Sequence, residues 1–142
     1  MSESKALYQT TAVNTGGRDG ESYLKDGDYS VKITTPKKLG GSDAGQNPEQ
    51  LFALGYSACY NGALELKMKE AGVKGKSRVS AEVTLNSDPT DNGFKISVKL
   101  TVAIDGQPTE VVQDLANQAH AFCPYSKATQ GNIVVDVVTE DY

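Results

Sequence analysis

Two cysteines and one histidine are the residues of this sequence best suited to covalent chemistry. Cys59 lies inside the apolar stretch GYSACYNGAL, and Cys123 lies in AHAFCPYSK, three residues after His120. A thiolate is a nucleophile and a metal ligand, and two thiols can interconvert with a disulfide. These residue types point to nucleophilic or redox chemistry if the fold brings them together.

Each of these residues also has a structural interpretation. A free cysteine is among the most buried residue types and packs like a small hydrophobic side chain. A zinc site made from Cys59, Cys123 and His120 has no familiar spacing and lacks a fourth ligand. His120 could activate a thiol, although a histidine at a helix end commonly contacts the terminal carbonyl groups. Residue types alone leave the structural and catalytic roles open.

The composition argues against several classes of function. The chain has 142 residues and a formal net charge of −4, which suits one domain over residues 1–142 with a core that needs no disulfide or metal. Its Lys and Arg residues are scattered, so there is no basic footprint for nucleic acid or anionic lipid. The N-terminal stretch lacks the apolar core of a signal peptide, and no segment approaches the roughly 20 apolar residues of a membrane span. We therefore expect a cytoplasmic protein without nucleic-acid or membrane partners, and disulfides in that compartment are usually transient.

Alternating apolar residues predict several strands and one hairpin. The stretch GGRDG has the glycine density of a turn between the first two strands, and SDPTDNG contains the turn residues of a hairpin connection. The predicted strands are LYQTTAVNT from Leu7, YSVKITT from Tyr29, RVSAEVTLN from Arg78, FKISVKLTVAI from Phe94 and NIVVDVV from Asn132.

A long helix is predicted between the second and third strands. Asn47 suits an N-cap, Pro48 suits the first helical position, and Ala71–Gly72 marks a plausible end. Its first half is apolar on nearly every side, which is typical of a central buried helix. A second helix is expected from about Pro108 to Ala121, and Pro124 disfavours a helical conformation for Cys123. Antiparallel strands around a central buried helix make the fold class α+β.

Four segments together carry a resemblance to a known family. They are GGRDG at 16–20, LGG at 39–41, NPEQLFALGYSACYNGAL at 47–64 and AHAFCPYSKATQGN at 119–132. In their order and spacing the sequence resembles the organic hydroperoxide resistance proteins, the Ohr branch of the Ohr/OsmC family. The resemblance implies an α+β intertwined homodimer that acts as a thiol-dependent peroxidase on alkyl and fatty-acid hydroperoxides. It also implies that no cofactor or metal is bound and that a lipoylated protein or dihydrolipoamide supplies the electrons.

The resemblance also implies roles for individual residues. Cys59 matches the peroxidatic cysteine and Cys123 the resolving cysteine, so a transient Cys59–Cys123 disulfide is expected. Arg18 and Glu49 match the pair that organises the reactive thiolate. An OsmC-type general peroxidase, and a redox sensor or apolar-ligand binding protein without turnover, are the alternatives.

The sequence departs from the family's usual residues at two places. Tyr60 and Asn61 stand where a Phe followed by an apolar residue is usual, and Gln130 stands where Arg is common. The first departure bears on the shape of the substrate pocket. The second affects none of the four residues assigned to the site.

Peroxide chemistry explains why an arginine belongs beside a buried cysteine. Burial raises the pKa of a thiol, so a fixed positive charge near Cys59 is needed to reverse the shift. Arg18 suits this role because its guanidinium stays charged and offers several donors. Lowering the thiol pKa from roughly 8.5 to about 6 corresponds to on the order of 3 kcal/mol and raises the ionised fraction at pH 7 roughly thirtyfold. A thirtyfold gain in thiolate is too small to explain an efficient peroxidase. Arg18 is therefore also expected to stabilise the leaving alkoxide, and Glu49 is expected to hold the guanidinium of Arg18 in a bidentate pair.

Helix geometry leads to one further expectation. Glu49 and Cys59 are ten residues apart, which separates them by roughly 15 Å along a helix axis. Either the helix breaks near Gly55 or a second subunit supplies Glu49, and we expect the second, with the site at a dimer interface. Phe52 and Tyr56, with Tyr60, are expected either to belong to the core or to form an apolar approach that favours alkyl peroxides.

Overall fold

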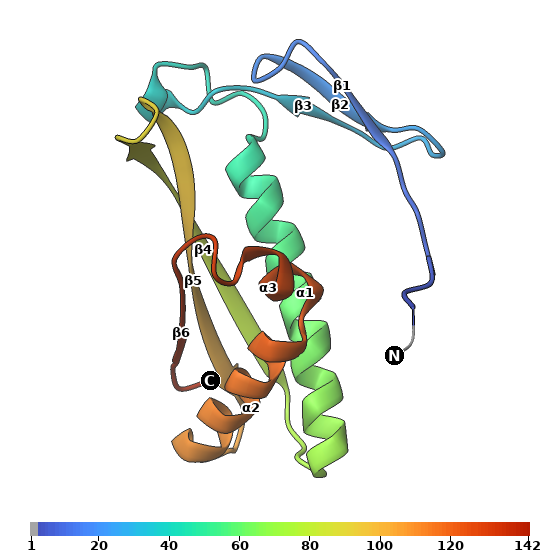
Figure 1. Ribbon diagram of the computed structural model, residues 1–142, viewed down its shortest axis with the longest axis vertical. Helices are drawn as coiled ribbons and strands as arrows, with labels where there is room; N and C mark the ends of the chain where they lie inside the picture. The colour runs from blue at the N-terminus through green and yellow to red at the C-terminus, as the bar shows by residue number, and fades with distance from the viewer. Residues whose placement is uncertain (1–2) are drawn as a thin grey trace. The chain divides into compact units, whose positions relative to one another are not determined.

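The computed structural model describes residues 3–142, and Figure 1 shows their helices and strands. Contacts within the chain define two compact units, one ending at Pro48 and the other spanning Glu49–Tyr142. The mixture of helices with two small sheets confirms the α+β class. The single domain expected over residues 1–142 stays a prediction. No helix among the described residues is long and apolar enough to cross a membrane.

The first unit contains an antiparallel sheet in the order β1-β2-β3. Its strands are β1 (Ala12–Thr15), β2 (Gly20–Leu24) and β3 (Ser30–Ile33), and a short 3-10 helix, η1 (Lys37–Leu39), follows. The strand expected from Leu7 begins only at Ala12. β2 was not predicted, because its five residues, GESYL, alternate too weakly to show a buried face and are extended through pairing with both neighbours.

The predicted glycine-rich turn joins β1 to β2. Gly16 and Gly17 have φ angles of 86° and 62°, a region that glycine adopts without steric cost. A Cβ at Gly16 would also lie 2.6 Å from the carbonyl oxygen of Asp19. The side chain of Asn14 braces the turn by accepting a hydrogen bond of 2.9 Å from the backbone of Gly17. The turn therefore needs its glycines, and it carries Arg18.

The second unit contains a sheet of β4 (Ser77–Asp88), β5 (Gly93–Ile104) and β6 (Val135–Thr139). The β4–β5 hairpin is antiparallel and confirms the prediction from SDPTDNG. β6 instead runs parallel to β5, which differs from the expected antiparallel arrangement. The reason is the connection: the chain passes through two helices between these strands and returns to the same end of the sheet.

The long helix α1 (Pro48–Ala71) begins and ends where the sequence predicts. Gly72, with a φ angle of 67°, follows its last residue. The helix is continuous through Gly55, so the expected alternative of a break there is wrong. One face is buried in the core cluster of this unit: Tyr56, Tyr60, Ala63, Leu64 and Met68.

The opposite face of α1 is exposed, contrary to the expectation of a helix buried on nearly every side. Leu54 is 63% exposed and Leu66 is 38% exposed. Ala58 and Gly62 lie between them at the same four-residue spacing and are exposed as well. Apolar composition could not distinguish a helix buried within one chain from a helix that leaves one apolar face uncovered.

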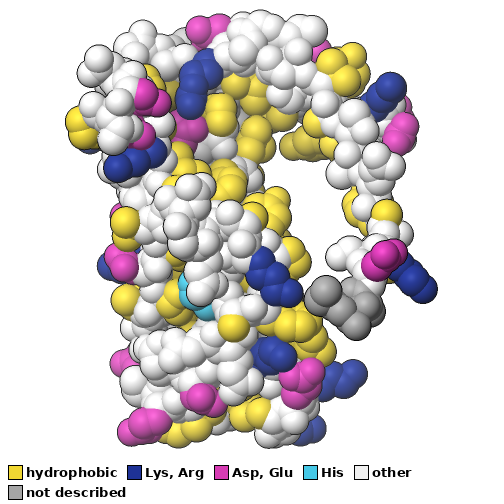
Figure 2. All heavy atoms as spheres, in the orientation of Figure 1, with side chains coloured by type: hydrophobic (Ala, Val, Ile, Leu, Met, Phe, Trp, Pro, Cys, Tyr) yellow, Lys and Arg dark blue, Asp and Glu magenta, His cyan; other side chains and the backbone are white. Residues whose placement is uncertain are grey.

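Two further helices complete the second unit. α2 (Thr109–Phe122) matches the predicted second helix, whereas the six-residue α3 (Pro124–Thr129) was not predicted. The core combines α1 and α2 with β5, including the fully buried side chains of Leu100 and Val102. On the face shown in Figure 2, Lys and Arg side chains are interspersed with Asp and Glu, as the sequence indicated.

Candidate functional site

The fold brings the two cysteines into contact although they are 64 residues apart. The thiol of Cys123 donates a hydrogen bond to the sulfur of Cys59, with 3.6 Å between the Sγ atoms. Both cysteines are free, and Cys123 is fully buried while Cys59 is partly buried. A disulfide has an S–S distance of about 2.05 Å. The structure therefore shows a dithiol in which a movement of the sulfurs by about 1.5 Å would allow a bond to form.

Cys123 is the single residue that links α2 to α3. Its backbone is extended, with φ −60° and ψ 127°, as expected for the residue before Pro124. Its N–H still donates to the carbonyl of Ala119 at 2.8 Å, and its carbonyl accepts from the N–H of Lys127 at 2.9 Å. Hydrogen bonds to both helices thus hold the backbone of Cys123.

Tyr125 of α3 packs on the face of α1 that leads to Cys59. Its ring centroid lies 5.8 Å from that of Phe52 and 5.5 Å from that of Tyr56. A Cβ at Gly55 would lie 2.7 Å from the Tyr125 hydroxyl oxygen. Gly55 therefore provides space for Tyr125 and does not break the helix. The backbone of Tyr125, in the first turn of α3, makes a hydrogen bond to the sulfur of Cys59.

The surroundings of Cys59 disfavour its thiolate. Burial raises the pKa of the Cys59 thiol above its usual value, the Tyr125 backbone hydrogen bond opposes the shift, and the neighbouring Cys123 raises the pKa further. A thiol with a raised pKa is almost fully protonated at pH 7. A nearby cation would oppose this shift, and the role expected for Arg18 beside Cys59 stays a prediction.

His120 contacts a serine in this structure. Its Nδ1 atom lies 2.9 Å from the Oγ atom of Ser126, and burial lowers the pKa of His120, so that its imidazole is neutral at pH 7. Among residues 3–142, no cluster of three His, Cys, Asp or Glu side chains is arranged to hold a metal ion. The contact with Ser126 gives His120 a structural partner.

An apolar hollow is lined by residues of α1 and α3. It has a volume of about 450 Å³ and is lined by Phe52, Pro124, Tyr125, Ala128 and Thr129. Of the aromatic residues expected near Cys59, Phe52 lines this hollow. Tyr56 and Tyr60 are fully buried and belong to the core cluster.

The departures from the usual family residues are accommodated by polar contacts. The hydroxyl of Tyr60 donates to the carbonyl of Ala116 at 2.5 Å. The Oδ1 atom of Asn61 accepts a hydrogen bond of 2.7 Å from Ser77. Because buried polar groups need partners, these bonds explain how a tyrosine and an asparagine fit inside the unit. Gln130 is exposed, just after the last residue of α3.

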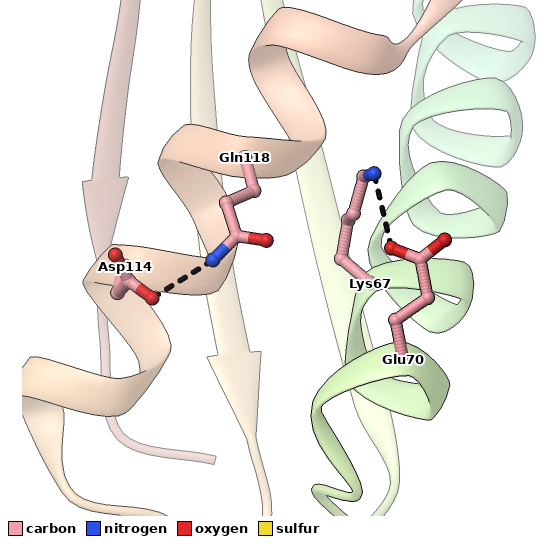
Figure 3. Close-up of polar contacts among 4 residues, drawn as sticks. All are labelled: Lys67, Glu70, Asp114 and Gln118. Atoms are coloured by element: carbon pink, nitrogen blue, oxygen red, sulfur yellow. Dashed lines mark hydrogen bonds and ion pairs between the residues drawn. The ribbon is translucent and has the colours of Figure 1, made fainter.

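A cation–aromatic contact holds the end of α2 against α1. The Nζ atom of Lys67 lies 4.4 Å from the ring centroid of Phe122, the residue before Cys123. The same atom donates to Glu70 at 3.1 Å, as Figure 3 shows beside the Asp114–Gln118 hydrogen bond of α2. Sequence reasoning missed this contact, because no local pattern relates Lys67 to Phe122.

Arg18 and Glu49 lie in different compact units. Arg18 is exposed in the β1–β2 turn of the first unit, and Glu49 is partly buried in the first turn of α1. Because α1 is unbroken between Glu49 and Cys59, roughly 15 Å of helix axis separates their backbones. The structure thus brings the two cysteines together, and the Arg18–Glu49 pairing stays a prediction.

Comparisons with known proteins agree on one family. The family model described as "OsmC-like protein" matches residues 40–138. A relative from Bacillus subtilis, the organic hydroperoxide resistance protein OhrB, is 44% identical over 130 residues, covering 92% of this chain and 96% of the relative. The crystal structure of OhrB from B. subtilis is similar with a TM-score of 0.87 and 42% identity, covering 95% of this chain and 100% of the other.

A second solved structure extends the similarity to nearly the whole chain. It is an organic hydroperoxide resistance protein from Elizabethkingia anophelis with thiocyanate bound, and it is similar with a TM-score of 0.91 and 41% identity. The match covers 98% of this chain and all of that one. With residues 40–138 matched by the family model and these identities over most of its length, the chain belongs to the Ohr/OsmC family, in the branch of the organic hydroperoxide resistance proteins.

Proposed function

We propose that the chain is a thiol-dependent peroxidase that reduces alkyl and fatty-acid hydroperoxides to alcohols. The observation that carries the proposal is the contact of 3.6 Å between the sulfurs of Cys59 and Cys123, because a dithiol at this distance can cycle through a disulfide. The apolar hollow lined by Phe52 and Tyr125 suits an alkyl group. The organic hydroperoxide resistance proteins among its relatives support the substrate class.

The reaction proceeds through two steps at the cysteine pair, followed by reduction of the disulfide. The thiolate of Cys59 attacks one oxygen of the peroxide, the O–O bond breaks, and the leaving alkoxide takes a proton to become an alcohol. Cys59 is now a sulfenic acid. The thiol of Cys123 attacks its sulfur, forming the Cys59–Cys123 disulfide and releasing water. An external dithiol, dihydrolipoamide or a lipoylated protein, restores both thiols by exchange.

Arg18 supplies the positive charge that this chemistry requires, and Glu49 orients it. The guanidinium of Arg18 stabilises the thiolate of Cys59 against the pKa-raising effect of burial and donates to the developing alkoxide. Glu49 orients the guanidinium through a bidentate pair. In these roles Arg18, oriented by Glu49, would provide the positive charge that a buried thiol needs in order to ionise. A reducing compartment such as the cytoplasm keeps the cycle supplied with thiols.

A homodimer reconciles the spacing of these residues with the unbroken helix. Glu49 and Cys59 of one chain are too far apart along α1 to share one guanidinium directly, so a second copy supplies one partner. The exposed stripe of Leu54, Ala58, Gly62 and Leu66 on α1 offers an apolar surface for that copy. Small residues at the centre of the stripe permit close approach of another backbone.

We expect the purified chain to be a dimer, and a charge on the exposed stripe to dissociate it. Leu54→Glu should give a folded monomer without peroxidase activity, because burying an unpaired carboxylate in an interface is unfavourable. Light scattering coupled to size-exclusion chromatography measures the mass, and circular dichroism checks the fold. An active monomer, in the wild type or in this variant, would contradict the shared site.

The proposed activity is tested by comparing substrates and reductants. The reduced protein should consume cumene hydroperoxide catalytically with dihydrolipoamide, and more efficiently than hydrogen peroxide, because the alkyl group fills the apolar hollow. The same reactions are repeated with dithiothreitol in place of dihydrolipoamide. A preference for the alkyl peroxide that persists with both reductants belongs to the peroxide step and not to the reductant. Equal efficiency with both peroxides would favour a general peroxidase of the OsmC type. Oxidation of the thiols without turnover would favour a redox sensor or an apolar-ligand binding protein.

A further inference from the structure

A chain of buried hydrogen bonds joins α1, α2 and α3 near the cysteine pair. The hydroxyl of Tyr56, on α1, lies 2.8 Å from the Oγ atom of Ser126 and 3.1 Å from the Oγ1 atom of Thr129, both on α3. Ser126 also lies 2.9 Å from the Nδ1 atom of His120, on α2. Tyr56 and Ser126 are fully buried. Ser126 is therefore the point at which the three helices meet through polar atoms.

The donors and acceptors of this chain have a self-consistent order. Thr129 donates its single hydroxyl hydrogen to the carbonyl of Tyr125 at 3.0 Å, so it accepts from Tyr56. Tyr56 then accepts from Ser126, and Ser126 accepts from the Nδ1–H of His120. In this order each hydroxyl hydrogen has one acceptor. The imidazole of His120 can lose or gain a proton at Nε2 without disrupting these hydrogen bonds. Among the described residues, no buried side-chain nitrogen or oxygen lacks a partner.

The hydrogen-bond chain through Ser126 holds α3 in position, and the position of α3 sets the distance between the sulfurs of Cys59 and Cys123. α3 has six residues, too few to be stable without tertiary contacts. Cys123 immediately precedes α3, and the backbone of Tyr125 in its first turn contacts the sulfur of Cys59. A shift of α3 relative to α1 would therefore move Cys123 relative to Cys59.

We propose that Ser126 is a positioning residue for disulfide formation. This inference rests on the proposed function, since the step it serves is the attack of the Cys123 thiol on the Cys59 sulfenic acid, which forms the S–S bond and releases water. The sulfurs must approach from 3.6 Å to about 2.05 Å. Through Tyr56 and His120, Ser126 keeps the α2–α3 corner in the place from which this short approach is possible.

Single-turnover measurements on the full chain test the proposal. Reduced Ser126→Ala protein is mixed with one equivalent of cumene hydroperoxide, and two rates are followed: loss of peroxide, and loss of alkylatable Cys123 by mass spectrometry. We expect disulfide closure to slow about tenfold, the effect of one or two lost hydrogen bonds. Peroxide loss should change by less than about threefold, because the Ser126 hydroxyl does not contact Cys59.

A second variant and a matched control guard against a trivial loss of structure. Tyr56→Phe keeps the ring and removes only the hydroxyl that contacts Ser126 and Thr129, so it should also slow closure. The double variant should be less impaired than the product of the two single effects, because both act through one network. Ser97→Ala is the control, since it removes an acceptor 3.0 Å from Asn86 in the β4–β5 hairpin. Closure at the wild-type rate in folded Ser126→Ala, or equal slowing of both steps, would overturn the proposal.

A measurement without peroxide separates this inference from the proposed function. The same proteins are equilibrated with mixtures of oxidised and reduced dithiothreitol, and the fraction of Cys59–Cys123 disulfide is determined after alkylation. Ser126→Ala should need an oxidised-to-reduced ratio about tenfold higher for half-oxidation. If the ratio shifts but neither the wild type nor any variant consumes peroxide, the proposed peroxidase activity is refuted and the positioning role of Ser126 is retained. Peroxide consumption with an unchanged ratio would refute the positioning role alone.

Discussion

Replacing Cys59 with serine should reduce peroxide turnover by more than about 10³-fold, because removing a nucleophile eliminates the step that breaks the O–O bond. Cys123→Ser, reduced beforehand and assayed without further reductant, should instead consume one equivalent of peroxide and then stop. In that variant Cys59 still forms the sulfenic acid, but no neighbouring thiol can form the disulfide. Peroxide consumed per protein chain, measured in a single-turnover assay, distinguishes the two outcomes.

The two variants control for one another because both replace one sulfur with oxygen in the same contact. A sulfenic-acid-specific probe should label Cys123→Ser protein after one equivalent of alkyl hydroperoxide and should not label Cys59→Ser protein. Loss of the first turnover in Cys123→Ser would show that Cys123 takes part in the attack on peroxide. Retained turnover in Cys59→Ser would place the nucleophile elsewhere.

Replacing Arg18 with glutamine should move the reactivity of Cys59 to higher pH. Burial raises the pKa of this thiol, and the guanidinium of Arg18 is proposed to lower it. The reactive thiolate forms as pH rises through the pKa, so the midpoint of the alkylation rate should lie at higher pH in Arg18→Gln than in the wild type. At pH 7 the thiolate fraction should fall roughly thirtyfold, and kcat/KM should fall by about 10²- to 10³-fold or more because the alkoxide also loses a donor.

The other arginine of the sequence provides a matched control. Arg78 pairs with Glu140 at 3.0 Å and lies over the ring of Tyr142, so Arg78→Gln removes the same charge at a different place. Rates of alkylation by iodoacetamide between pH 5 and pH 10 should shift for Arg18→Gln and stay unchanged for Arg78→Gln. Glu49→Gln should shift them in the same direction by less, since Arg18 keeps its charge but loses its orientation. An unchanged profile in Arg18→Gln would remove Arg18 from the site.

Much of the fold followed from local signals in the sequence. Pro48 and Gly72 marked both ends of α1, and the turn residues between β4 and β5 marked the hairpin. Pro124 correctly predicted an extended backbone at Cys123. Each of these features depends on steric preferences of a few consecutive residues, so no knowledge of distant contacts was needed.

Two elements that were not predicted, β2 and α3, and the direction of the predicted strand β6 depend on contacts with other elements. β2 is extended because β1 and β3 flank it, and α3 is helical although it is shorter than an isolated helix can be. β6 pairs in parallel because the intervening helices return the chain to the same end of the sheet. None of these causes lies in the residues of the element itself.

The sequence by itself determined which chemical groups the protein carries: two thiols, a histidine three residues before one of them, and a family pattern that includes Arg18 and Glu49. Only the tertiary structure decided that Cys59 and Cys123 meet at 3.6 Å and that His120 turns to Ser126. It also decided that Gly55 makes room for Tyr125 within an unbroken helix. The physical reason is that residue types set reactivity, whereas packing between helices distant in the chain sets the distances on which reaction depends.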